Sequence, residues 1–132
     1  MRDDRGSMVV ESVILAPVFV LFLFFVSFVG RIVSTQHELN LAADVAAREA
    51  SMSRAGSITS QAIQAANSSM KQHDSFCHSL QTRVFKKVIS NVTHVEVVTS
   101  CRVDVAGLSL LGIRPPTLAS TSREVIDVYR HP

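Results

Sequence analysis

The sequence predicts an α+β fold in which helices come first and a small antiparallel sheet comes last. No residue from Ser12 to Gly30 is charged, apolar residues then recur at helical spacing to about Lys71, and apolar and polar residues alternate from Thr93 to Val105. These three patterns predict a long N-terminal transmembrane helix that continues beyond the membrane, then a second helix, then strands.

The composition argues against two classes of protein, nucleic-acid binders and enzymes with a deep cleft. The 132 residues include 13 basic and 11 acidic residues, giving a net charge of +2. The basic residues are not clustered, which argues against nucleic-acid binding. Five of the seven Phe lie between Val13 and Val29, and the chain has no Trp. The rest of the chain therefore has few large side chains for a core, which argues against an enzyme with a deep cleft for a small-molecule substrate.

The uncharged segment from Ser12 to Gly30 is long enough to cross a membrane. As a helix its 19 residues span about 28 Å, close to the ~30 Å hydrocarbon core of a bilayer. The apolar run exceeds the roughly 7–15 residues of a secretory signal, and no A-x-A cleavage site follows it. Arg2 and Arg5 precede the segment whereas only Arg31 follows closely, so the N-terminus is expected in the cytoplasm.

Beyond the membrane, we expect helices over about residues 31–72. One narrow face of the first part consists mainly of small residues: Ile32, Gln36, Leu39, Ala43, Ala46, Ala47 and Ala50. Such a face suits close packing against sister subunits or against the domain's own sheet. Gly56 is expected to end this helix, and Ser57 to cap a second helix from about Ile58 to Lys71.

The alternating pattern predicts two antiparallel strands, at about 92–105 and 118–130, joined by a long loop that contains Gly107 and Gly112. A short strand or helix near Arg83–Ile89 is expected to complete the sheet.

Cys77 and Cys101 are the only cysteines, and both fall on the extracytoplasmic side, where disulfides persist. We expect a bridge that ties the second-helix region to the first strand; two free buried cysteines are the alternative.

A metal or catalytic site has little support in the sequence. His73, Cys77 and His78 lie close together, but zinc requires three or four ligands, and the cysteine has a better use in the disulfide. We therefore expect no metal, no cofactor and no catalytic residues. A membrane-bound enzyme subunit that uses this region is the weakest hypothesis.

Glu11 interrupts an apolar run that otherwise begins at Met8. A carboxylate at the membrane edge is costly unless it is paired, which marks Glu11 as a functional candidate. Its position alone also fits a simpler role at the headgroup level, at the start of the helix.

The residues around Glu11 resemble the processing signal of type IV pilins and pseudopilins. The segment reads Arg5-Gly6-Ser7-Met8-Val9-Val10-Glu11 and is followed directly by the apolar helix. The resemblance implies that a prepilin peptidase cuts between Gly6 and Ser7 and removes a leader of residues 1–6. Glu11 then becomes the fifth residue of the mature chain, where these families have a Glu.

Two further segments, Glu11–Pro17 and Leu41–Ala50, resemble TadE-like proteins, which are minor pilins or pseudopilins of the tight-adherence system. The resemblance implies a transmembrane helix at 7–30 and a pilin-like extracytoplasmic domain at 31–132. It also implies a prepilin peptidase, other pilin or pseudopilin subunits and the pilus assembly platform as partners. Ser12 stands where many small pilins of this class have Tyr, which favours a minor over a major subunit.

In this family setting, Glu11 is expected to pair with the new α-amino group of a neighbouring subunit, and Pro17 is expected to kink or locally unwind the helix. The expected function is pilus assembly and adhesion, without enzymatic activity. The expected location is the bacterial cytoplasmic membrane, crossed once, and two alternatives stay open: the protein remains in the membrane, or it is incorporated into the pilus. The alternative is a single-pass anchored module for extracytoplasmic binding or secretion, in which Glu11 can be replaced freely.

Overall fold

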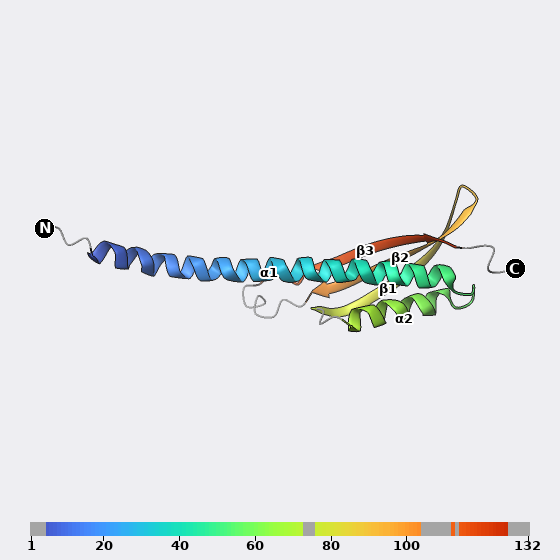
Figure 1. Ribbon diagram of the computed structural model, residues 1–132, viewed down its shortest axis with the longest axis horizontal. Coiled ribbons are helices and arrows are strands. Elements are labelled where there is room, and N and C mark those ends of the chain that lie inside the picture. The colour runs from blue at the N-terminus through green and yellow to red at the C-terminus, as the bar shows by residue number, and fades with distance from the viewer. Residues whose placement is uncertain (1–4, 73–75, 104–111, 113, 127–132) are drawn as a thin grey trace. The chain divides into compact units, whose positions relative to one another are not determined.

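A computed structural model describes residues 5–72, 76–103, 112 and 114–126. The chain divides into two compact units, unit 1 at Met1–Ile32 and unit 2 at Val33–Pro132. The elements follow in the order α1 (Arg5–Met52), α2 (Ile58–Lys71), β1 (Cys77–Ile89), β2 (Val92–Val103) and β3 (Thr117–Val125) (Figure 1). Helices first and an antiparallel sheet last confirm the α+β prediction.

Unit 1 contains the apolar part of α1. Most of its described large apolar side chains are exposed, from 40% at Val29 to 69% at Phe24. By length and composition α1 can cross a membrane, and none of the residues in its most apolar stretch is buried within the chain. An apolar helix that is left uncovered in this way requires lipid or another protein around it. The helix continues through Pro17, so the unwinding considered at that residue does not occur.

In unit 2 the small-residue face of α1 packs into the core. Its fully buried residues are Leu39, Ala42, Ala43, Ala46, Ala47 and Ala50. Ala46, Ala47 and Ala50 share one cluster with the α2 residues Ile58, Ala62 and Ala66 and with Val95 and Val97 of β2. The predicted face is therefore confirmed, and of the two partners considered for it, the domain's own sheet is the correct one.

Two hydrogen bonds also join α1 to the sheet. The Thr99 hydroxyl donates to the Leu39 carbonyl at 3.3 Å, and the Gln36 amide donates to the Ala119 carbonyl at 3.2 Å. Because Thr99 lies beside Leu39 while Val95 belongs to the cluster that contains the later α1 residues Ala46, Ala47 and Ala50, β2 runs in the opposite direction to α1.

Close packing at this face makes Ala47→Leu destabilising. Ala47 has no exposed surface, and a Leu there must displace its neighbours, so we expect the free energy of unfolding to fall by about 1–3 kcal/mol. Thermal or denaturant unfolding of the protein in detergent micelles measures the change. Val45→Leu, at an exposed position of the same helix, is the matched control and should stay within about 0.5 kcal/mol of the wild type. Equal stability of the two variants would contradict this packing.

The end of α1 lies four residues before the predicted stop at Gly56. Serine hydroxyls bond the last carbonyls of the helix: Ser51 Oγ donates to the Arg48 carbonyl at 2.8 Å, and Ser53 Oγ donates to the Glu49 carbonyl at 2.6 Å. Carbonyls satisfied in this way allow the helix to end without glycine. Ser57 does precede α2, as predicted, but its side chain makes no capping hydrogen bond.

The sheet has the order β1-β2-β3, and both pairings are antiparallel. β2 and β3 correspond to the two predicted strands. β1 corrects the prediction of a short strand or helix near Arg83–Ile89, because it is a full strand of 13 residues that starts at Cys77. Ser90 and Asn91 link it to β2 with φ of 49° and 66°. Such a left-handed two-residue turn is the connection that antiparallel strands favour.

Cys77 and Cys101 form a disulfide with their Cα atoms 5.7 Å apart. The two cysteines pair as predicted, but the bridge joins different elements from those expected. Because Cys77 belongs to β1, the bridge joins two neighbouring strands and does not tie a helix to a strand. Residues 104–111, 113 and 127–132 lie outside the described residues; they include the predicted ends of both strands, at 104–105 and 127–130, and Gly107 of the predicted loop.

Candidate functional site

Glu11 lies on an open face of α1 in unit 1. It lines a shallow hollow together with Ser12, Leu15, Ala16 and Phe19. The spacing of four residues places Glu11, Leu15 and Phe19 along one side of the helix. The smaller Ser12 and Ala16 lie beside them and leave room for another molecule to approach. A carboxylate therefore lies at the start of an exposed apolar helix face, where a second helix can contact it.

Gly6 and Ser7 belong to the first turn of α1, which begins at Arg5. The first four backbone N–H groups of a helix have no carbonyl partner within the helix, and helix ends fray readily. The Gly6–Ser7 bond therefore lies where the backbone costs least to unwind. Ser7 precedes Glu11 by four residues, or about 6 Å along the helix axis.

Pro17 is a second polar irregularity in the apolar helix. Proline has no N–H, so it cannot donate the hydrogen bond that the Val13 carbonyl would receive in a regular helix. In a lipid environment such a carbonyl favours a donor from a neighbouring helix or water. The Glu11 carboxylate and the Val13 carbonyl left without a donor by Pro17 therefore both favour contact with another polar group within the membrane.

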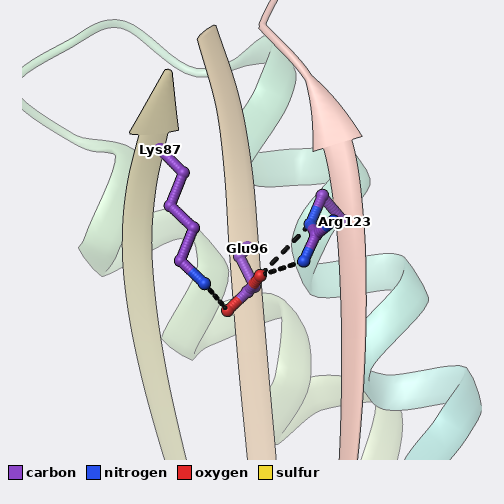
Figure 2. A network of polar contacts seen from close by, with 3 residues as sticks. All are labelled: Lys87, Glu96 and Arg123. Carbon is purple, nitrogen blue, oxygen red and sulfur yellow. Dashed lines mark hydrogen bonds and ion pairs between the residues drawn. The ribbon is translucent and has the colours of Figure 1, made fainter. Parts of the chain in front are cut away.

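A cluster that the sequence analysis missed lies on the outer face of the sheet, away from the helices (Figure 2). Glu96 of β2 is only 7% exposed. Its Oε1 accepts a hydrogen bond from Lys87 Nζ at 2.7 Å, and its Oε2 accepts two from Arg123, from Nη2 at 2.6 Å and Nε at 3.1 Å. Each strand of the sheet thus contributes one residue of the cluster.

Both cations favour the charged form of Glu96. The hydrogen bonds from Lys87 and then Arg123 hold the pKa of the Glu96 carboxyl below its usual value of 4.5, although desolvation opposes them. Lys87 and Arg123 themselves are half-exposed. A carboxylate neutralised by two cations is a poor base, so the cluster is suited to linking the three strands.

Acid should remove the contribution of this cluster to stability. Because the pKa of Glu96 is lower in the folded than in the unfolded state, the stabilisation is present above about pH 4.5 and is lost as the pH falls through the folded pKa. We expect wild type and Glu96→Gln to differ most in unfolding temperature near pH 7 and to converge below pH 4.5. Parallel thermal unfolding from pH 7 to pH 3 measures this difference. If the difference in unfolding temperature stays constant or widens as the pH falls, the charged form of Glu96 is not the source of the stabilisation.

Of the three residues considered for a metal site, the structure describes two, Cys77 and His78. Cys77 is held in the disulfide, and His78 is exposed on β1. His73 lies outside the described residues. Within the described ranges, no group of three or more His, Cys, Asp or Glu side chains is placed to hold a metal ion.

Comparison with known proteins finds one family that the N-terminal segment is similar to. Residues 6–48, about a third of the chain, match the model of the family described as TadE-like protein. The match begins at Gly6 and includes Glu11, Pro17 and most of the alanine-rich face of α1. It confirms the resemblance found in the sequence and indicates a protein associated with a Tad pilus. Neither the curated proteins nor the solved structures give a match.

Proposed function

From the TadE-like segment at residues 6–48, we propose that this protein is a pseudopilin or minor pilin of a Tad-type (type IVc) pilus or secretion system. Prepilin peptidase processes it, and it acts in pilus assembly and adhesion as a structural subunit, not as an enzyme. One observation carries the proposal: the Glu11 carboxylate lies on an uncovered apolar helix, four residues after the Gly6–Ser7 bond.

Cleavage creates the charge that Glu11 requires. In the precursor the nitrogen of Ser7 is a neutral peptide amide. After cleavage it is an α-amino group, whose usual pKa of about 7.7–8.0 leaves it largely cationic at neutral pH. A carboxylate in a low-dielectric environment is stable only beside such a cation.

The spacing of the two groups sets how subunits pair. Ser7 lies one helical turn before Glu11. A neighbouring subunit displaced by about one turn along the helix axis brings its amine level with Glu11 of the first. Processing by the peptidase thereby acts as the switch for assembly, because only cleaved subunits can form this pair.

The proposed location follows from charge and from the disulfide. Arg2 and Arg5 favour a cytoplasmic N-terminus. Unit 2 contains the Cys77–Cys101 disulfide, which is stable in an oxidising compartment. The protein therefore crosses the bacterial cytoplasmic membrane once, with unit 2 outside, and enters the pilus from there.

The intact mass of the protein from membranes of its native host tests the processing step. We expect the six residues Met1–Gly6 to be missing and Ser7 to be the N-terminus, with or without a methyl group on its amine. Gly6→Leu, which blocks access to the scissile bond, should retain the leader. A wild-type protein that starts at Met1 or Arg2 would overturn the proposal in favour of an anchored module. Loss of everything to about Gly30 would indicate a secreted domain.

A further inference from the structure

The end of the β1–β2 hairpin exposes an unusual group of apolar side chains. We define the hairpin tip as residues 85–92. Four large apolar residues in this short segment are exposed: Phe85 by 44%, Val88 by 70%, Ile89 by 43% and Val92 by 42%. The core of unit 2 leaves them uncovered.

Both faces of the hairpin tip carry exposed apolar side chains. Ile89 pairs with Val92, and strand alternation places them on the sheet face that carries Glu96. Val88 pairs with Thr93 and belongs to the opposite face, which carries Val95. Val95 is fully buried, whereas Val88, at 70%, is the most exposed apolar residue among the described residues of unit 2. The tip therefore extends past the core and projects away from the helices (Figure 1).

The hairpin tip is also cationic. Lys86 and Lys87 lie between Phe85 and Val88, and the segment contains no acidic residue. Lys87 binds Glu96, but that carboxylate also binds Arg123, so the three-residue cluster keeps a net positive charge. Lys86 has no partner among the described residues. The tip thus combines projecting aliphatic side chains with the unpaired Lys86 ammonium group and the net positive charge of the Lys87–Glu96–Arg123 cluster.

The apolar residues on both faces of the tip and its positive charge together indicate the kind of partner. A flat protein surface would cover only one face of the hairpin, whereas a medium that surrounds the tip covers both Val88 and Ile89. The positive charge selects an anionic medium. Lipid headgroups over an acyl boundary have both properties, because apolar side chains enter the boundary and ammonium groups bind phosphate oxygens.

We propose that the hairpin tip docks onto a lipid surface with anionic headgroups. Val88, Ile89 and Val92 enter the headgroup–acyl boundary, and Lys86 binds the phosphates. Within unit 2, β2 runs opposite to α1, so the tip lies at the Met52 end of that unit. In the test, the lipid surface is offered as vesicles that are separate from the bilayer that holds unit 1. The proposal goes beyond the pilin function and does not depend on cleavage at Gly6.

Vesicle flotation tests the docking with the full chain. The protein is held in nanodiscs of phosphatidylcholine and mixed with vesicles of phosphatidylcholine alone or of phosphatidylcholine and phosphatidylglycerol in equal parts. We expect the wild type to float with the anionic vesicles and not with the neutral ones. Lys86→Gln should weaken binding roughly fivefold, from the attraction of one basic residue to an anionic surface. Ile89→Asn should weaken it by a similar or larger factor.

Matched control variants distinguish the role of the hairpin tip from the effect of removing any exposed apolar residue or any positive charge. Val45→Asn removes an equally exposed apolar side chain from α1, and Lys71→Gln removes a charge from α2, so neither should change flotation. Unfolding temperatures check that each variant remains folded. Failure of the wild type to float with anionic vesicles would overturn the proposal. So would undiminished flotation of both Lys86→Gln and Ile89→Asn, or binding that only a protein partner supports.

Discussion

Replacing Glu11 with Ala should leave a subunit that is cleaved and membrane-inserted but nearly absent from assembled pili. The variant removes the carboxylate that the amine of a neighbouring subunit requires. Truncating one partner of a desolvated ion pair typically costs about 2–5 kcal/mol, which corresponds to a loss of about thirtyfold or more in association. The amount of the protein in sheared pili, relative to the amount in membranes, measures this effect.

Three further variants identify the charge as the cause. Glu11→Gln keeps the size of the side chain and should fail as Glu11→Ala does, whereas Glu11→Asp should retain partial assembly. Leu15→Ala changes an apolar residue of the same hollow and should assemble nearly as well as the wild type. Normal recovery of Glu11→Ala in sheared pili would show that the carboxylate has no role in assembly.

The double variant Cys77→Ala/Cys101→Ala should lose about 3.5 kcal/mol of unfolding free energy. The bridge spans a sequence separation of 24 residues, and the chain-entropy model gives this value for a loop of that size. The loss is large for unit 2, whose buried core consists mainly of Ala and Val. Denaturant unfolding in detergent micelles measures it.

Reduction supplies the matched control for the disulfide. Wild type treated with dithiothreitol should approach the stability of the double variant, and the double variant itself should not respond to the reductant. A reduced wild type as stable as the oxidised protein would contradict a stabilising role for the bridge.

The helices were predictable because their signals are local. The apolar run of unit 1, the small residues of α1 and the helical spacing from Ile58 to Lys71 each need only one element to be recognised. β1 gave no such signal. It is an edge strand with an irregular register between Cys77 and Ser79, and its far end projects with both faces exposed, so its residues do not alternate cleanly.

Glu11 and the Glu96 cluster also differ in whether they could be found from local sequence. Glu11 was found because it is a lone carboxylate beside an apolar helix, and its neighbours in sequence are its neighbours in space. Glu96 lies 9 residues from Lys87 and 27 from Arg123. Only the register of three strands brings them together, and one of those strands was not predicted at full length. Long-range pairing of this kind cannot be inferred from local patterns.

The most direct measurement of the central claim is a zero-length cross-link in assembled pili. A membrane-permeant carbodiimide joins a carboxylate to an amine that is in contact with it, and mass spectrometry identifies the linked peptides. If Glu11 pairs with the N-terminus of a neighbouring subunit, an amide bond forms between the Glu11 carboxyl and that amine, and the bond is absent in Glu11→Gln. Assembled wild-type protein in which Glu11 forms no bond to any subunit's N-terminus would show that this pair does not exist.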